Sequence, residues 1–392
     1  MISQNRRLTM KDNQAKYPQL RFKGFTDPWE ERKLEDIFLY KQGQQVPVEN
    51  QFTKPGKHRH RFIRIVDLTT TDEEPRYIEY SGRNTISATD LFMIRYGQPG
   101  VIGYGYEGVI ANNLFKLIPK VKANNRFFKY RLDSMYPKIQ SLSSSTTMPA
   151  ISFKSLDVLD VRYPDIKEQE KIGAFFKQLD DTITLHQRKL TKLKELKQGY
   201  LQKLFPKNGS KFPQLRFTGF ADAWEERKLK DVVEKQIKGK AQFEKLAPGE
   251  VEYLDTSRLN GGQAILTNGL KDVTLDDILI LWDGSKAGTV YHGFEGALGS
   301  TLKAYRTSAN SKFVYQYLKR HQDNIYNNYR TPNIPHVQKD FLNVFTISVP
   351  MSDEQEKIGS FFKQLDDTIT LHQRKLEKLQ ELKKGYLQKM FC

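Results

Sequence analysis

One long segment occurs twice in this chain of 392 residues. It runs from Glu168 to Phe205 and again from Glu354 to Phe391, with 33 of 38 positions identical. Its apolar residues alternate spacings of three and four, which is the seam of a coiled coil. An amphipathic helix requires only an apolar stripe, so near-identity of the two copies requires a further reason.

We expect the two helices to pack on each other, because a lone helix would leave its apolar stripe in water. Either direction is sterically possible, but a pseudo-two-fold between the halves requires antiparallel pairing. The alternative is that each helix packs only on its own domain. Lys197 interrupts the seam, and we expect Leu196 to take its place as at a stutter. The residues expected to pair are Ile172, Phe176, Leu179, Ile183, Leu190, Leu193, Ile358, Phe362, Leu365, Ile369, Leu376 and Leu379.

A shorter block is also duplicated. Residues 16–37 read KYPQLRFKGFTDPWEERKLEDI, and residues 211–232 read KFPQLRFTGFADAWEERKLKDV. Residues 39–167 and 234–353, between the short and long blocks, show no obvious letter-for-letter match. The layout is constant, variable, constant, twice over. A period near 190 residues is too long for a solenoid, so we expect two domain-sized units.

The variable regions read as mixed helix and strand. Runs such as HRFIRIVDL and VEYLDTSRL are rich in residues that favour strands, and glycines crowd the segments after DLFMIRYG and DDILILWDG. At the helix starts, Asp165 with Glu168 and Ser352 with Gln355 resemble capping boxes. We therefore predict an α/β fold of mixed α+β type.

Charge and cysteine content narrow the function class. The net charge of +17 attracts polyanions, of which nucleic acid is the usual one. No apolar run approaches the roughly 20 residues of a membrane-spanning helix, and the opening residues lack an apolar signal core. Cys392 is the only cysteine, which excludes disulfides and fits the cytoplasm.

Catalytic motifs are weak. Gly103, Gly105 and Gly108 satisfy G-x-G-x-x-G, but no amphipathic helix follows, so we expect a hairpin loop. The sequence lacks a Walker motif and offers neither a catalytic nor a metal-ligating set. Three readings remain open: a DNA-binding subunit, a stand-alone DNA-modifying enzyme, and a coiled-coil scaffold that does not bind DNA.

The doubled arrangement closely resembles the specificity (S) subunit of Type I restriction-modification enzymes. The resemblance rests on FPQLRFTGF…WEERKL, on EQEKI…FF..LD..I at the head of the long helix, and on their repetition. It implies two target recognition domains with twisted β-sheets, joined by two long antiparallel helices that form a coiled coil in a pseudo-two-fold repeat. The predicted segments are a basic N-terminal tail (1–15), target recognition domain 1 (16–165), a central helix (166–206), a linker (207–210), target recognition domain 2 (211–351) and a C-terminal helix (352–392).

The resemblance also implies a function. Such a subunit is non-catalytic, and it selects a bipartite, asymmetric double-stranded DNA target whose parts are spaced by the helices. It does so for two methylation (M) subunits, which bind S-adenosylmethionine and methylate adenine N6, and for restriction (R) subunits that use ATP and Mg. This chain itself would hold no cofactor and no metal. Two nearly identical helices would offer two nearly identical docking surfaces.

The variable regions contain motifs that resemble those of target recognition domains, namely HRFIRIVDL with VEYLDTSRL, DLFMIRYGQPGVIGY with DDILILWDGSKAGTV, and TTMPAIS with TPNIPHV. Lysines mainly contact phosphates, whereas Arg, Asn and Gln can bond to base edges. The expected DNA-binding residues are Lys54, Lys57, His58, Arg59, Arg61, Arg64, Tyr96, Gln98, Tyr104, Thr146, Thr147, Lys238, Lys240, Ser257, Arg258, Trp282, Ser285, Lys286, Arg330 and Asn333.

Overall fold

The computed structural model describes residues 17–70, 73–144, 147–207, 209–331 and 335–391. The chain divides into two compact units. Unit 1 comprises Met1–His186 with Lys375–Cys392, and unit 2 comprises Gln187–Arg374. Each unit therefore holds one short block, one variable region and a part of each long helix. The predicted mixed fold with two repeated units is confirmed.

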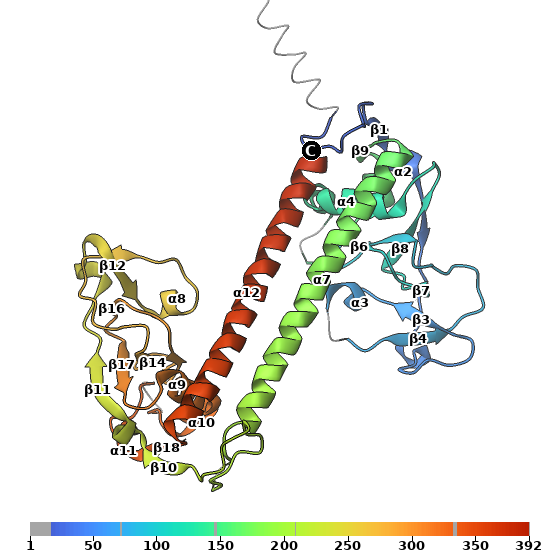
Figure 1. Cartoon of the computed structure of the whole chain (residues 1–392). Helices are drawn as coiled ribbons and strands as arrows, with labels where there is room; N and C mark the ends of the chain where they lie inside the picture. The colour runs from blue at the N-terminus through green and yellow to red at the C-terminus, as the bar shows by residue number, and fades with distance from the viewer. Residues whose placement is uncertain (1–16, 71–72, 145–146, 208, 332–334, 392) are drawn as a thin grey trace, which may run out of the picture. The chain divides into compact units, whose positions relative to one another are not determined.

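The variable region of unit 1 forms two small sheets (Figure 1). The four-stranded sheet has the order β2-β8-β5-β6, and the three-stranded sheet has the order β4-β3-β7, with β3 and β7 parallel. Strands β1 and β9 pair separately. The elements are β1 (Glu30–Lys33), α2 (Leu34–Ile37), β2 (Phe38–Gln42), η1 (Val48–Asn50), β3 (Arg59–Ile63), α3 (Val66–Thr69), β4 (Arg76–Glu79), β5 (Leu91–Ile94), β6 (Ile102–Gly103), β7 (Val109–Ile110), β8 (Leu114–Pro119), α4 (Asn125–Ser134), α5 (Tyr136–Ser141), α6 (Phe153–Asp157) and β9 (Asp160–Tyr163).

Unit 2 repeats this topology. Its sheets have the orders β11-β17-β14-β15 and β13-β12-β16, with β12 and β16 parallel, and β10 pairs with β18. The elements are β10 (Glu225–Lys228), η2 (Leu229–Val232), β11 (Val233–Lys238), η3 (Phe243–Lys245), β12 (Pro248–Leu254), α8 (Thr256–Leu259), β13 (Leu266–Thr267), β14 (Ile278–Leu281), β15 (Val290–Tyr291), β16 (Ala297–Leu298), β17 (Leu302–Thr307), α9 (Ser311–Arg320), α10 (Gln322–Asn328), α11 (Phe341–Val344) and β18 (Thr346–Val349).

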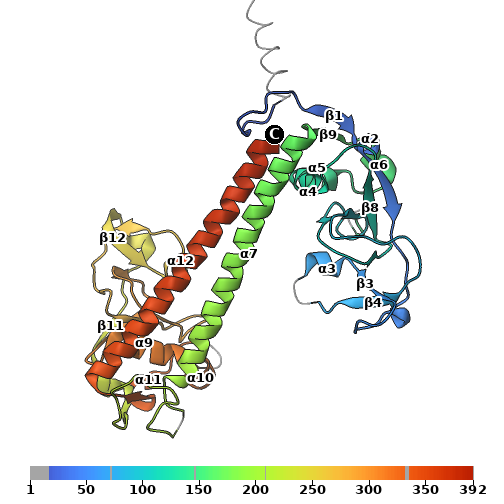
Figure 2. The same cartoon turned by 45° about the vertical axis from the view of Figure 1, so that its right-hand side comes forward.

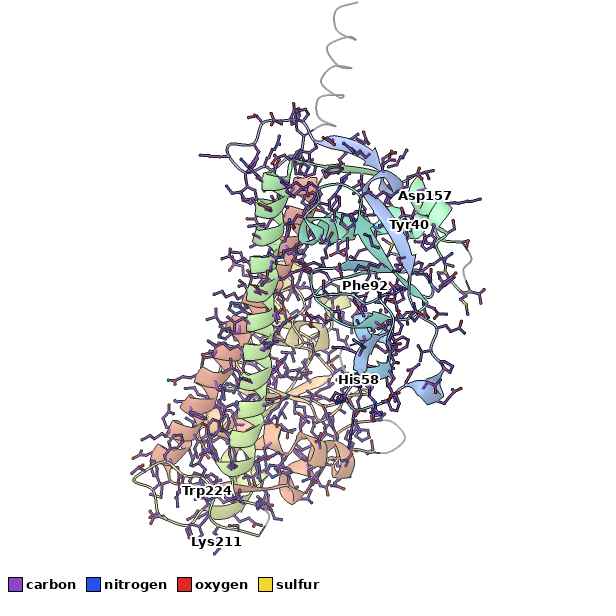
Figure 3. All side chains as sticks on the ribbon, turned by 90° about the vertical axis from the view of Figure 1, so that its right-hand side faces the viewer. Tyr40, His58, Phe92, Asp157, Lys211 and Trp224 are labelled. Atoms are coloured by element: carbon purple, nitrogen blue, oxygen red, sulfur yellow. The ribbon has the colours of Figure 1, made fainter. Side chains whose placement is uncertain are left out.

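Continuous apolar runs in the sequence form the strands at the core of each unit. β5 reads LFMI and β14 reads ILIL, and every residue of both strands is buried, as a strand covered on both faces requires. Figure 3 labels Phe92 of β5, which is fully buried, and Trp224 of unit 2, which packs against Phe205 with ring centroids 6.1 Å apart. Each core therefore combines strands from the variable region with residues of the repeated blocks.

The G-x-G-x-x-G segment is not a hairpin. Gly103 ends β6 in the four-stranded sheet, and Gly108 precedes β7 in the three-stranded sheet, so the loop joins two different sheets. Gly108 has a φ of 141°, and a Cβ there would lie 2.1 Å from the carbonyl oxygen of Arg61. The glycine therefore permits a close backbone approach between strands, a role unrelated to nucleotide binding.

The long helices are α7 (Ile166–Lys203) and α12 (Ser352–Phe391). Within each unit they lie side by side and run in opposite directions (Figures 1 and 2). In unit 1, Phe176 stacks on Phe391 with centroids 5.6 Å apart. In unit 2, Tyr200 meets Phe361 edge-on at 5.0 Å. The predicted antiparallel arrangement is therefore confirmed within each unit.

Burial follows the predicted seam, with one exception. The buried members are Ile172, Phe176, Ile183, Leu190, Ile358, Phe362 and Leu376, and the half-buried ones are Leu179, Leu193, Leu365, Ile369 and Leu379. The stutter prediction is wrong, because Leu196 is 46% exposed. Lys197 keeps the seam position instead, with 15% of its side chain exposed and its ammonium 2.6 Å from Asp366. The lysine stem covers apolar surface while its charge meets a carboxylate of the facing helix.

The capping boxes are only half right. Asp165 accepts hydrogen bonds from the backbone amides of Lys167 (2.8 Å) and Glu168 (3.3 Å), so it does cap α7. The Glu168 side chain does not return to the cap but bonds to Arg21. In the second copy Gln355 accepts a hydrogen bond from the backbone amide of Asn310 (2.9 Å) and donates one to the carbonyl oxygen of Pro350 (2.8 Å). In each expected box the second residue, Glu168 or Gln355, thus makes tertiary contacts rather than capping the helix.

Candidate nucleic-acid interface

Four segments of unit 1 meet at one edge of its four-stranded sheet: the end of β2, the loop after β5, the turn before β8 and residues 147–151. Backbone hydrogen bonds tie them together. These bonds run from Gly43 N to Leu114 O (2.9 Å), from Arg95 N to Asn113 O (2.7 Å), from Ile151 N to Arg95 O (3.0 Å) and from Gly97 N to Pro149 O (2.9 Å). We call this arrangement the four-segment frame.

Unit 2 builds the same frame from its own segments. The equivalent bonds run from Gly239 N to Leu302 O (3.0 Å), from Trp282 N to Thr301 O (2.8 Å), from Val337 N to Trp282 O (2.9 Å) and from Gly284 N to Pro335 O (2.9 Å). The backbone connections correspond one to one, whereas the side chains that the segments carry are different. The frame is therefore a constant support for variable side chains.

Glycine is required at one position of each frame. A Cβ at Gly43 would lie 2.2 Å from the carbonyl oxygen of Ala111, and a Cβ at Gly239 would lie 2.0 Å from that of Gly299. Any larger residue would separate the end of the first strand from the turn opposite it. This glycine is a local sequence signal that marks the frame in both variable regions.

The frame of unit 1 presents an arginine between amide and aromatic side chains. The Arg95 guanidinium donates to the Gln42 side-chain oxygen (2.9 Å) and to the carbonyl oxygen of Ile151 (3.1 Å). It also lies 5.0 Å from the ring centroid of Tyr96 and 4.3 Å from that of Phe153. Tyr96 is 37% exposed. Arginine and glutamine are the residue types that bond bidentately to guanine and adenine in the major groove.

The frame of unit 2 presents a different chemistry. Trp282 takes the place of Arg95, and the ammonium of Lys303 lies 3.1 Å from the centroid of its ring. Burial lowers the pKa of Lys303, and the charge of Lys238 lowers it further. A cavity of about 410 Å³ opens here, lined in part by Lys238, Trp282, Asp283 and His336. Lysines near an indole suit phosphate contact combined with stacking.

The frames bring together several of the predicted DNA-binding residues. Tyr96, Gln98 and Thr147 lie in the frame of unit 1 and are exposed. The predicted residues at or next to the frame of unit 2 are Lys238, Lys240, Trp282, Ser285, Lys286 and Arg330. Arg330 is held there by bonds to the carbonyl oxygens of Ser285 (3.0 Å) and Tyr326 (2.7 Å). Tyr104 is half-buried against the core of unit 1.

A second basic region of unit 1 lies around β3. Lys54, Lys57 and His58 are exposed in the preceding loop, where Figure 3 labels His58. His58 has a φ of 67°. The guanidinium of Arg59, the first residue of β3, lies 3.5 Å from the ring centroid of Phe52. This loop is a separate cationic surface that the frame does not include.

Other predicted arginines hold the fold together. Arg61 and Arg64 each lie 3.2 Å from Asp67, whose side chain is 1% exposed. In unit 2, Arg258 pairs with Glu252, and Ser257 beside it is exposed. These arginines have carboxylate partners within the domain. Thr146 and Asn333 lie outside the described residues.

Sequence reasoning missed several frame residues. Gln42, Gln45 and Arg95, with Asn112 and Asn113 in the turn before β8, carry amide or guanidinium groups at or beside the frame of unit 1. Their proximity depends on hydrogen bonds between segments that are distant along the chain, such as Gln42 to Arg95 and Arg95 to Ile151. The local signals were the glycine that follows the first strand of each variable region and the motif pairs DLFMIRYG with DDILILWDG and TTMPAIS with TPNIPHV.

Among the residues described, no group of three or more His, Cys, Asp or Glu side chains could hold a metal ion. Within the same part of the chain, no helix has the length and apolar character needed to span a bilayer.

Comparison with known proteins identifies the repeated units. Residues 26–195 and 221–381 match the family model described as Type I restriction modification DNA specificity domain. The chain is 30% identical over 190 residues to the MjaVIII specificity subunit of a Methanocaldococcus jannaschii Type I restriction enzyme, covering 46% of this chain and 44% of that one. It is 22% identical over 373 residues to S.MgeORF438P of Mycoplasma genitalium, which is named as a putative type I specificity subunit, covering 93% and 94% of the two chains.

A solved structure shares the fold of this chain. The crystal structure of a Type I restriction-modification S subunit from M. genitalium has a TM-score of 0.74 to this chain at 18% identity. The alignment covers 96% of this chain and 99% of that one.

Proposed function

Because this chain belongs to the Type I restriction-modification DNA specificity family, we propose that it recognises a bipartite, asymmetric double-stranded DNA sequence, each unit reading one part. One observation carries the proposal: both units build the same four-segment frame but present different side chains on it. A constant frame with different side chains suits two recognition surfaces that read different sequences. The subunit is non-catalytic, in keeping with its family.

The chemistry of each frame supports this reading. Arg95 and Gln42 carry donors and acceptors suited to base edges, whereas Lys238, Lys240 and Lys303 supply charge for phosphates. The net charge of +17 adds a sequence-independent attraction to the duplex. Base contacts and phosphate contacts are therefore assigned to different residues, which lie in different units.

The helices serve two further purposes in the proposal. They dock two methylation subunits, which use S-adenosylmethionine to methylate adenine N6, and through the complex they recruit restriction subunits that require ATP and Mg. They also act as a ruler that fixes the gap between the two parts of the target. Near-identity of α7 and α12 supports the docking role, because one kind of partner then finds two equivalent surfaces.

A cassette exchange tests the proposal. Residues 39–167 are replaced by the corresponding region of a relative, and the chimera is combined with the methylation subunit and sequenced for methylated adenines. We expect one part of the target to change and the other to remain. A change in both parts would contradict independent reading by the two units. A stand-alone enzyme would methylate or cleave without any partner, and a scaffold would leave no sequence-specific footprint.

A further inference from the structure

A row of half-buried aromatic side chains runs along the outside of unit 1. Phe22 of the short block meets Phe175 of α7 edge-on at 5.8 Å, and Phe175 meets Tyr386 of α12 edge-on at 5.1 Å. The Lys171 ammonium lies 5.3 Å from the ring of Phe22 and 5.7 Å from that of Phe25. Three segments distant in sequence thus form one surface. We call it the aromatic ledge; with the neighbouring Leu20 it comprises Leu20, Phe22, Phe25, Lys171, Phe175 and Tyr386.

Unit 2 carries the same ledge. Phe217 meets Phe361 at 5.8 Å, and Phe361 meets Tyr200 at 5.0 Å. The Lys357 ammonium lies 5.7 Å from the Phe217 ring and 5.9 Å from the Phe220 ring. The residues of this ledge are Leu215, Phe217, Phe220, Lys357, Phe361 and Tyr200, identical in type to the six of unit 1.

The leucines at the edge of the ledges are the most exposed apolar members. Leu20 is 39% exposed and Leu215 is 41% exposed. Their backbone amides donate to the carbonyl oxygens of Lys389 and Lys203, each at 2.9 Å, and these bonds fix the short block against the end of a long helix. The side chains themselves remain available to a partner.

Internal packing does not require the two ledges to be identical. Behind each ledge a short helix packs on the long one, and its residues differ between the units. Tyr130 of α4 donates to Asp180 (2.8 Å), whereas Gln316 of α9 donates to Asp366 (2.8 Å). Buried Phe128 corresponds to buried Val314. Since the interior tolerates such changes, the identity of the half-exposed surface points to a common external partner.

We propose that each aromatic ledge is the docking surface for one methylation subunit, so that one chain binds two copies through the same six residue types. This inference rests on the proposed function and specifies where its docking occurs. The ring edges require an apolar partner surface. The charges of Lys171 and Lys389, with Lys357 and Lys203 in unit 2, require acidic side chains around it. DNA is a poorer occupant, because the rings contact one another rather than presenting open faces for stacking.

Charge placed on the ledges tests this assignment. The full chain is prepared with Leu20→Glu, with Leu215→Glu, and with both, and each is mixed with the methylation subunit of the same restriction system. Native mass spectrometry and sedimentation then give the number of copies bound. We expect two copies on the unaltered chain, one on each single variant and none on the double variant, with affinity at an altered ledge reduced at least tenfold.

Matched controls come from the variable regions. Val48 is 75% exposed and Leu270 is 80% exposed, and neither belongs to a ledge. Val48→Glu and Leu270→Glu should leave two copies bound at the original affinity. Circular dichroism and binding to non-specific duplex should be unchanged in every variant, which shows that the chains are folded.

Three results would overturn the inference. If the double variant still binds two copies at the original affinity, docking occurs elsewhere while the proposed function stands. If the variants only abolish self-association of the chain, the occupant is a second copy of this protein. If the unaltered chain binds no methylation subunit at all, the docking part of the proposed function fails with it.

Discussion

Arg21 holds Glu168 through two hydrogen bonds, 2.8 Å from Nε and 2.6 Å from Nη2, although 147 residues separate them. The carboxylate is fully buried, and 12% of the Arg21 side chain is exposed. Arg216 and Glu354 repeat the pair in unit 2 at 2.8 and 2.7 Å. The short block is thus fastened to the first turn of the long helix in each unit, which explains why the two blocks are repeated together.

Removing the arginine should strongly destabilise unit 1. Arg21→Ala leaves the buried Glu168 charge without its partner, so we expect the free energy of unfolding to fall by about 3–5 kcal/mol. Urea unfolding of the full chain measures the change. Arg32→Ala is the control, because Arg32 and its partner Glu30 are both exposed and such pairs contribute about 1 kcal/mol or less. Equal losses in the two variants would contradict a special role for Arg21.

The seam lysine should be energetically coupled to its carboxylate. Lys197 and Asp366 are 2.6 Å apart within unit 2, and Lys383 and Asp180 repeat the pair in unit 1 at 2.7 Å. A double-mutant cycle of Lys197→Met and Asp366→Asn should give a coupling free energy of about 1 kcal/mol, since the pair is partly buried. The exposed pair Lys177 and Asp181 is the control, with an expected coupling of about 0.5 kcal/mol or less. Additive effects of the two seam substitutions would rule out an interaction in the folded state.

The sequence predicted the helices and their direction because both depend on local periodicity and on repetition. The seam prediction was wrong at Lys197, because a pattern of apolar residues alone favours Leu196 at this position. The partner that makes a lysine acceptable in the seam is Asp366, which belongs to the other long helix. The prediction for Glu168 was wrong for the same reason. Its spacing from Asp165 indicates a capping box, but the Arg21 guanidinium provides stronger hydrogen bonds to its carboxylate. Polar residues with distant partners are the ones that local patterns cannot assign.

The candidate interface was predictable only in part. Exposed basic residues such as Lys54 and Lys238 stand out from composition alone. Arg95 does not stand out in this way, because its place in the frame depends on its bonds to Gln42 and Ile151 in other segments. Arg64 is a different case: it pairs with the buried carboxylate of Asp67, and its contact with DNA stays a prediction.

Acid should weaken unit 2 through Asp277. Burial alone would raise the pKa of this carboxyl, but hydrogen bonds from Arg306 and Thr274 outweigh it and leave the pKa below its usual value. The unfolded chain then binds a proton more readily than the folded one. The stabilisation is therefore complete above the ordinary Asp pKa of about 3.9 and is lost as the pH falls through the lower folded pKa.

The substitution Asp277→Asn checks this dependence. Urea unfolding between neutral pH and strongly acidic pH should show a smaller decline for the variant than for the unaltered chain, together with lower stability at neutral pH. Asp160 of unit 1, whose pKa is also lowered by its bond to Lys33, is 43% exposed and serves as the comparison. If Asp160→Asn flattens the acid slope as much as Asp277→Asn, the hydrogen bonds from Arg306 and Thr274 give Asp277 no special part in the acid dependence.

Altering Arg95 should relax one part of the DNA target. Arg95→Ala removes a guanidinium that can bond bidentately to a base, so discrimination at that position should fall by about 1–3 kcal/mol. Sequencing of methylated adenines should then show extra bases accepted in the part read by unit 1 only. Lys54→Ala is the control, because loss of a phosphate contact weakens binding similarly for all sequences. If the variant accepted extra bases in both parts of the target, the proposal that Arg95 reads only the part bound by unit 1 would be contradicted.

The spacing of the two parts should follow helix length. Four extra residues placed at matching points near Lys192 of α7 and Lys378 of α12 add about 6 Å of helix, close to one turn. One base-pair step is about 3.4 Å, so the gap should lengthen by about one or two base pairs while both recognised parts stay the same. Insertion in α7 alone is the control: it puts the facing seams out of register and should reduce stability without creating a new spacing. Methylation mapping of the two variants beside the parent gives the gap directly. If the doubly lengthened chain methylates sites with the parental gap, helix length does not set the spacing.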